Sequence, residues 1–280
     1  MLKTGYVKSD DEYQQIDDYF NKHIAKFDED KFGFREKYWY YNANLWRSFL
    51  VQDFLSCYKF AHKWVTLFYD NPSMIYLNPV FFLKGNHYLL ESLFMLKYKS
   101  NFKKYLVQLE ETIHDPKFPV NDNIASLSFL YLYNNKLNYH ILEGSFAESE
   151  YLIPEVLYKM NQHSEHLDEH HEMLFYYKIA CLYFGAGKPA KAIDYLNRII
   201  NWKLNLRDDI QCYARLLHLI AHYELGNTDV VNYLSKSVYR FMYKMKNLST
   251  VEEVLFNFLR KSIQKGGEEN SLLSNKEIIK

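Results

Sequence analysis

The chain has 280 residues, and its 34 Lys and Arg are balanced by 34 Asp and Glu, so the formal charge at neutral pH is zero. This balance argues against a nucleic-acid-binding domain, which usually carries a basic excess, and no basic run lasts along the chain. Three widely spaced cysteines, Cys57, Cys181 and Cys212, argue against a disulfide framework. Only nine Gly and six Pro argue against a turn-rich β fold.

Helix signals follow one another along the chain with few breaks. Ser9 and Glu12 form a capping box at the first start, Asn78-Pro79 is a second typical start, and Gly144 is a typical end. Apolar residues recurring every three or four positions predict helices over 10–26, 34–49, 53–70, 79–98, 101–113, 121–143, 146–162, 169–184, 189–202, 207–225, 229–246 and 249–263. The tail 264–280 has no such period, and we expect it to be disordered.

The sequence carries no recognisable targeting or membrane-spanning segment. The N-terminal stretch MLKTGYVKSDDEYQQ lacks the apolar core of a secretory signal peptide and turns acidic early. We also find no uncharged apolar run of about 18 residues, the length that a membrane-spanning helix needs. We therefore expect a cytoplasmic protein with no membrane partner and no nucleic-acid partner.

A specific pattern of aromatic, small and apolar residues covers about 173–206, across two predicted helices and a glycine turn. Its positions are Tyr176, Ile179, Ala180, Tyr183, Gly187, Ala192, Leu196 and Ile199. This unit resembles a tetratricopeptide repeat, although Leu204 stands where that family has its closing proline. Other helix pairs match less completely. Their turns, aligned at Gln52, Ser100, Gly144, Gly187 and Gly226, are 48, 44, 43 and 39 residues apart, against roughly 34 in the regular repeat.

The resemblance implies an all-α fold: a right-handed α-α superhelix, or tetratricopeptide-like solenoid, of about five helical hairpins with capping helices at both ends. In such arrays a hairpin cannot bury its apolar face alone, and stacking on its neighbours completes the burial. We expect residues 1–263 to form a single domain of this kind.

The stretch NQHSEHLDEHHEM, residues 161–173, is the strongest candidate for chemistry. On one unbroken helix, His163, His166 and His170 would share a face and could ligate zinc. The stretch falls, however, at the joint between two predicted helices. We therefore favour a solvated, pH-sensitive joint and expect no metal site, with adventitious metal binding and a purposeful site as the alternatives.

No other motif indicates catalysis. The stretch FGAGKPAK, residues 184–191, lacks the first glycine and the Ser or Thr of a phosphate-binding loop, and it follows a helix where that loop follows a strand. The three cysteines lie in apolar helical patterns typical of core residues. We expect no catalytic residues, no cofactor and no enzymatic activity.

Aromatic residues are denser in 37–46 and 128–140 than one buried stripe requires. Tetratricopeptide-like arrays line their concave face with residues from the first helix of each hairpin. The resemblance places nine residues there: Trp39, Asn42, Trp46, Asn134, Asn138, Tyr177, Lys178, Tyr213 and Arg215. Asn amides pair with a peptide backbone, and aromatic rings supply contact area at low entropy cost. Lys178 and Arg215 would add charge for a carboxylate.

These features predict a non-catalytic scaffold or adaptor that binds a peptide or protein segment. A peptide-sensing regulatory module is an alternative, although no helix-turn-helix of sufficient length and basic charge precedes residue 34. An enzyme on a helical scaffold is a second alternative, which a closed pocket of converging His and acidic groups would indicate. A homo-oligomer is a further expectation, and a homodimer that buries Trp39 and Trp46 would indicate a structural role.

Overall fold

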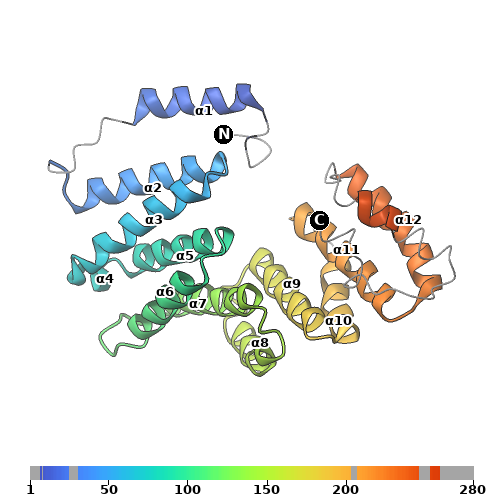
Figure 1. The fold of residues 1–280 in the computed structure, drawn as a ribbon. Helices are drawn as coiled ribbons and strands as arrows, with labels where there is room; N and C mark the ends of the chain where they lie inside the picture. Colours follow the sequence, from blue (N-terminus) through green and yellow to red (C-terminus); the bar gives the residue numbers. More distant parts are fainter. Residues whose placement is uncertain (1–6, 8, 25–30, 203–206, 246–252, 259–280) are drawn as a thin grey trace. The chain divides into compact units, whose positions relative to one another are not determined.

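The computed structural model describes residues 7, 9–24, 31–202, 207–245 and 253–258, and all regular structure within these residues is helical (Figure 1). The all-α prediction is therefore confirmed. The chain divides into two compact units, unit 1 over Met1–Glu143 and unit 2 over Gly144–Lys280. A single domain over 1–263 and a right-handed superhelix stay predictions, and the tail 264–280 lies outside the described residues.

Unit 1 is built from helix pairs that share one apolar core. Its helices are α1 (Asp10–His23), α2 (Phe34–Leu50), α3 (Phe54–Tyr69), α4 (Pro72–Leu77), α5 (Pro79–Met95), α6 (Lys99–Ile113) and α7 (Asp122–Glu143). Helix α3 packs against both α2 and α5, and α5 packs in turn against α6 and α7. Leu45, Trp64, Phe68, Phe82 and Leu89 are fully buried where these helices meet. Each pair thus covers the apolar face of the next.

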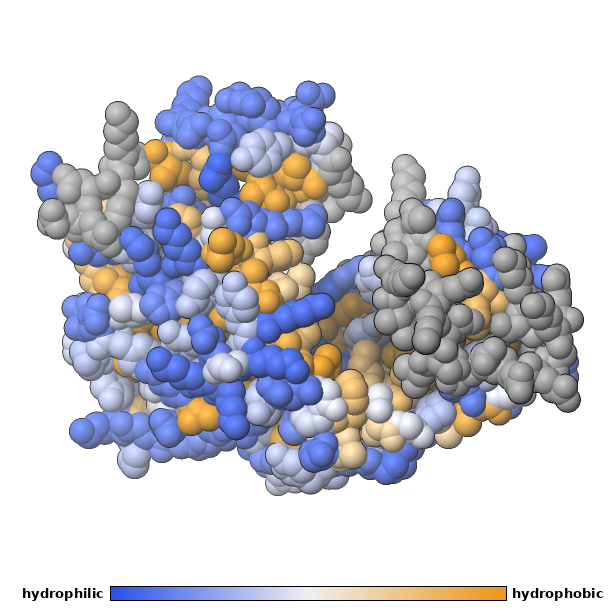
Figure 2. All heavy atoms as spheres, viewed as in Figure 1, coloured by the Kyte–Doolittle hydropathy of each residue, from blue (hydrophilic) through white to orange (hydrophobic). Residues whose placement is uncertain are grey.

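Helix α1 differs from the other helices of unit 1, because it has no buried residue. Its visible surface is mostly hydrophilic (Figure 2). Ser9 caps it as predicted, since the Glu12 amide donates to the Ser9 hydroxyl over 3.3 Å. An ion pair between Asp17 and Arg47 joins α1 to α2. Ile16, Phe20 and Ile24 are half-buried, so partial apolar burial and this ion pair together hold α1.

Unit 2 follows the same pairing principle. Its helices are η1 (Glu148–Tyr151, a 3-10 helix), α8 (Leu152–Gln162), α9 (Glu169–Gly185), α10 (Pro189–Ile200), α11 (Asp208–Glu224) and α12 (Thr228–Lys244). Helix α10 packs against both α9 and α11, and α12 packs against α11. Residues 253–258 are helical, and Phe256 is buried in a cluster that includes Val238 and Met242 of α12.

Four helix pairs are joined by the same backbone turn. The turns after α2, α5, α9 and α11 each place one residue in the left-handed region, at Gln52, Lys97, Gly187 and Gly226. In each turn the next amide donates to a carbonyl five residues back: Asp53 to Ser48 (2.9 Å), Tyr98 to Leu93 (3.0 Å), Lys188 to Tyr183 (2.9 Å) and Asn227 to His222 (3.1 Å). This is the Schellman motif, which satisfies carbonyls left open at a helix end. Recurrence of one turn is what a chain of similar hairpins requires.

Lys97→Gly is expected to raise the free energy of unfolding by about 0.5–1 kcal/mol, because a Cβ in the left-handed region crowds the following carbonyl. Lys97 has φ 57°. Gly187→Ala is the matched reverse change: its φ is 71° and a Cβ there would meet no atom within 4 Å, so only backbone strain is added. Urea denaturation followed by circular dichroism measures both. A loss of stability in Lys97→Gly would contradict the assignment of strain to this turn.

The observed helices differ from the predicted ones at three places. The helix predicted over 53–70 is followed by the short helix α4, which Pro72 opens and which the sequence pattern does not predict. The helix expected over 146–162 begins as a 3-10 turn. The second hairpin turn lies at Lys97 instead of Ser100. The sequence pattern does not reveal it, because a lysine takes the left-handed position where glycine or asparagine is usual. Part of the helix expected over 249–263 lies outside the described residues.

In the part of the chain that the structure describes, we find no helix that is both long and apolar enough to cross a membrane.

Candidate functional site

Two tryptophans of α2 are half-exposed on one side of that helix. Trp39 is 51 % exposed and Trp46 is 47 % exposed, whereas the neighbouring Tyr38 and Leu45 are buried. Their seven-residue separation is about two helical turns, which places the two indoles about 10.5 Å apart along the axis. Large aromatic side chains left in water at helical spacing mark a surface suited to binding.

Two rings of α5 brace these tryptophans. The Phe81 ring lies 6.2 Å from Trp39 with an interplanar angle of 67°. The Tyr88 ring lies 5.5 Å from Trp46 with an angle of 72°. Both are edge-to-face contacts, the geometry that aromatic pairs favour. We call these four residues the aromatic strip. Because Phe81 and Tyr88 are also seven residues apart, the strip forms two parallel rows.

Sequence reasoning missed Phe81 and Tyr88. The signal that could have found them is their spacing within the helix predicted over 79–98, which repeats the spacing of Trp39 and Trp46. Burial, with smaller contributions from Tyr131 and Glu91, raises the pKa of Tyr88 to about 12. The phenol is therefore neutral at physiological pH and acts as an uncharged ring and hydroxyl.

The three predicted asparagines are placed differently. Asn42 is half-buried on α2 between Trp39 and Trp46, and its side chain forms no hydrogen bond within the described residues. Asn134 and Asn138 of α7 are only 3 % and 2 % exposed. The structure therefore joins Asn42 to the aromatic strip and places the other two amides inside the protein. A peptide-binding role for Asn134 and Asn138 stays a prediction.

In unit 2, the structure brings Tyr177 of α9 and Tyr213 of α11 together. Burial raises the pKa of Tyr177, with further contributions from Cys181 and from Tyr213. Tyr213 is 41 % exposed and so presents its ring to solvent. Tyr213 is therefore the most accessible of the predicted residues in unit 2, and Tyr177 is half-buried beside it.

The two predicted cations of unit 2 are half-buried. The Arg215 guanidinium lies 4.1 Å from the centroid of the Phe241 ring. It also donates to the Gln211 side chain and, over 3.3 Å, to the Ile200 carbonyl. Arg215 thus links α11 to α10 and α12 through contacts of its own. Lys178 is half-buried on α9. Carboxylate binding by Lys178 and Arg215 stays a prediction.

The histidine tract is a joint between two helices. Helix α8 ends at Gln162, and α9 begins at Glu169 after Asp168, whose backbone is extended. The Asp168 carboxylate caps α9 by accepting from the His171 amide over 2.9 Å, and it lies 2.7 Å from the His171 ring. His170 instead contacts Arg207 over 3.0 Å. The unbroken helix that a shared histidine face requires is therefore not formed.

The chemistry of the remaining groups is consistent with structural roles. Among the described residues we find no group of three or more His, Cys, Asp or Glu that could hold a metal ion. Burial raises the pKa of Cys57 to about 12 and that of Cys181 to about 11. Both thiols stay protonated at neutral pH, whereas a nucleophilic cysteine needs its thiolate.

Comparisons with protein-family models, with curated proteins and with solved structures found no significant match to this chain.

Proposed function

We propose that this protein is a non-catalytic scaffold that binds an extended segment of a protein partner on the aromatic strip of unit 1. The observation that carries the proposal is the pair of half-exposed tryptophans, each braced by a ring of α5. Tryptophan and tyrosine are enriched among the residues that dominate binding energy at protein interfaces. Bracing holds the indoles in place before a partner arrives, so less side-chain entropy is lost on binding.

The proposed architecture is a tetratricopeptide-like solenoid, a right-handed superhelix of about five helical hairpins. Two features support it: the same Schellman turn follows α2, α5, α9 and α11, and helices pack in both units against the next helix and the next but one. In such an array α2 and α5 are the first helices of successive hairpins. The aromatic strip would then lie on the inner face.

Asn42 lies between the two tryptophans and would contribute backbone recognition. An amide can donate to a peptide carbonyl and accept from a peptide N–H at the same time. The strip would therefore take apolar side chains at Trp39 and Trp46 and hold the intervening backbone at Asn42. Tyr177 and Tyr213 would offer a second contact surface in unit 2.

A selection experiment tests the proposal. A phage library of random linear peptides is selected on the whole chain, and enriched peptides are titrated against wild type and against Trp39→Ala/Trp46→Ala. The double variant is expected to weaken binding by at least about tenfold, because truncating tryptophan at an interface centre typically costs about 2 kcal/mol or more. Tyr233→Ala/Tyr243→Ala removes two rings that are 76 % and 71 % exposed elsewhere, and should leave affinity unchanged.

Equal affinity of the enriched peptides for wild type and the tryptophan variant would overturn the proposal. Concentration-dependent dimerisation that is lost in Trp39→Ala/Trp46→Ala would instead assign the strip to a homodimer. Enriched peptides that bind through Tyr177 and Tyr213 alone would favour the alternative of a peptide-sensing module centred on unit 2.

A further inference from the structure

A hollow follows the outer surface of α3 in unit 1. One part has a volume of about 500 Å³ and is lined by Leu55, Ser56, Tyr58, Lys59, His62 and Lys63. A second part, of about 190 Å³, is lined by Lys37, Tyr41, His62, Lys63, Thr66, Leu67 and Asp70. Because the two parts share His62 and Lys63, they form one groove, which we call the α3 groove. None of its lining residues belongs to the aromatic strip.

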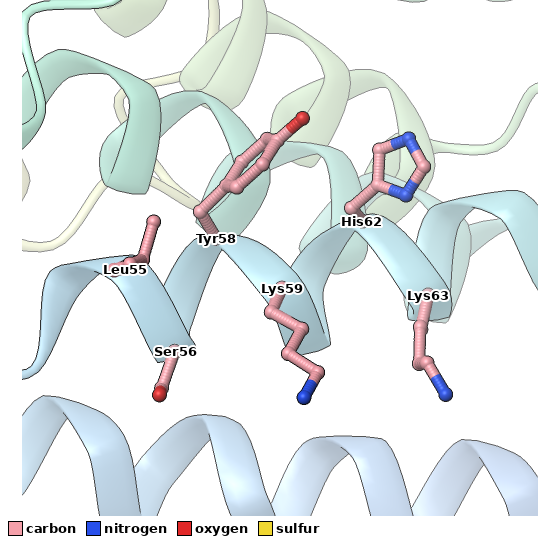
Figure 3. Close-up of a pocket in the computed structure, with 6 residues that line it drawn as sticks. All are labelled: Leu55, Ser56, Tyr58, Lys59, His62 and Lys63. Carbon is pink, nitrogen blue, oxygen red and sulfur yellow. The ribbon is translucent and has the colours of Figure 1, made fainter.

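Two lysines of the α3 groove, Lys59 and Lys63, point the same way. Figure 3 shows the amino groups of Lys59 and Lys63 on one side of α3, and the rings of Tyr58 and His62 on the other. Lys59 is exposed, and neither it nor Lys37 forms an ion pair within the described residues. One carboxylate, Asp70, lines the groove, at its far end. The groove therefore carries an excess of positive charge.

The surrounding chain extends this excess. Between residues 31 and 109 eleven Lys or Arg stand against four Asp or Glu, although the whole chain is neutral. The composition of this part of the chain is therefore basic, although its cations are dispersed and form no continuous run. The region already attracts one carboxylate, because Arg47 pairs with Asp17 of the acidic helix α1.

The aromatic wall of the groove is braced by α6. Tyr58 contacts the Tyr98 ring at 6.4 Å, and His62 contacts the Tyr105 ring at 5.9 Å. Lys104 lies 5.5 Å from the Tyr105 ring centroid. Burial, and then the charge of Lys104, lower the pKa of His62. The wall is therefore neutral and aromatic at physiological pH, with cations at its edges.

We propose that the α3 groove binds an acidic, extended peptide segment of a partner protein, with Asp or Glu at alternate positions. Lys59 and Lys63 are one helical turn apart, so their Cβ atoms lie about 6 Å apart. Alternate side chains of an extended strand lie about 6.6 Å apart on one side, which matches this spacing. The residues between them would face Tyr58 and Leu55. Asp70 would repel an acid at the far end and so fix the direction of the segment.

A peptide suits the groove better than a nucleic acid. Single-stranded RNA is held by bases that stack on open aromatic faces, whereas Tyr58, His62 and Tyr105 already contact one another or their neighbours in the wall. A membrane surface would need a broader cluster of about 4–8 cations. Two lysines one turn apart beside an apolar wall are matched to a short run of carboxylates.

The test uses the whole chain and fluorescence anisotropy. The probe is a fluorescein-labelled peptide that alternates aspartate and phenylalanine, compared with the same peptide carrying asparagine at each aspartate. We expect the acidic probe to bind, the neutral probe to bind at least about tenfold more weakly, and salt to weaken the acidic complex. Lys59→Gln/Lys63→Gln should weaken binding of the acidic probe at least about tenfold.

The matched control is Lys236→Gln/Lys244→Gln, which removes the same charge from two exposed positions of α12 and should leave affinity unchanged. Equal loss in both double variants would overturn the proposal, because it would assign the effect to net charge. Tighter binding of an oligouridylate or of phosphatidylserine vesicles, or no binding of the acidic probe, would also overturn it. Trp39→Ala/Trp46→Ala should bind the acidic probe with wild-type affinity. The test of the α3 groove is therefore independent of the test of the aromatic strip.

Discussion

Replacing Trp64 with alanine is expected to lower the free energy of unfolding by about 3–5 kcal/mol, the usual cost of truncating a buried tryptophan. Trp64 is fully buried on α3. Its ring lies 5.0 Å from that of Tyr38 on α2 and 6.1 Å from that of Tyr88 on α5. Alanine would leave a cavity where three helices meet. Urea denaturation followed by circular dichroism measures the loss.

Trp64→Phe is the control for this prediction. The Trp64 Nε1 atom is buried without a hydrogen-bond partner in the described part of the chain. Phenylalanine therefore keeps most of the packing and removes an indole N–H group that donates no hydrogen bond. We expect Trp64→Phe to cost clearly less than Trp64→Ala. Equal costs for the two variants would show that the indole edge, and not the filled volume, determines stability here.

A double-mutant cycle with Gly85 locates the contact. A Cβ at Gly85 would lie 2.8 Å from Trp64 Nε1 and 2.9 Å from its Cδ1, so Gly85→Ala is expected to cost about 1–3 kcal/mol through overpacking. In the Trp64→Ala background the added methyl enters the cavity, and the cost should disappear or change sign. Strictly additive effects would contradict this close crossing of α3 and α5.

Acid is expected to destabilise the protein through His218. Burial, and then the charges of His222 and Arg215, lower the pKa of His218 to about 4. The unfolded chain binds a proton at this residue as pH falls through about 6.5, while the folded chain does so only near pH 4. The contribution of neutral His218 to the free energy of unfolding is therefore fully present above about pH 6.5. It is lost progressively as the pH falls to about 4. The loss amounts to about 3 kcal/mol.

The ring of His218 lies 4.6 Å from the ring of His222, measured between centroids. His218→Phe removes the titrating group and keeps a ring at this position. We expect the difference in unfolding free energy between pH 7 and pH 4 to shrink by about 3 kcal/mol. Burial also lowers the pKa of His62, His163, His170 and His222, so a shallower slope of the same sign should remain. A pH difference in His218→Phe equal to that of wild type would refute the assignment to His218.

Two of the four residues of the aromatic strip followed from the sequence. The resemblance singled out Trp39 and Trp46, and the structure leaves both indoles half in solvent; peptide binding by them stays a prediction. Phe81 and Tyr88 were missed because apolar periodicity cannot say which neighbouring helix a ring will touch. The α3 groove was missed because the spacing of Lys59 and Lys63 on one helix does not show whether a hollow lies beside them.

Asn134 and Asn138 show what a resemblance does not decide. The resemblance assigns both to the binding face, whereas the structure buries both side chains on α7, which is buried on nearly all sides. Its Asn135 shows how a helix accommodates a buried amide, since the side chain donates to the Tyr131 carbonyl of its own helix over 2.7 Å. A hydrogen bond made within one helix leaves no trace in the pattern of polar and apolar residues.

The sequence by itself determined most of the helices of this protein and many of their ends. Helix ends depend on local signals: caps such as Ser9, starts such as Asn78-Pro79 and glycines in the left-handed region. Each signal acts within a few residues, so the adjacent sequence is enough to predict its effect. Only the tertiary structure decided which faces stay in water. Exposure depends on residues far apart in the chain, as when α5 braces Trp39 and Trp46 but α7 takes Asn134 into the interior.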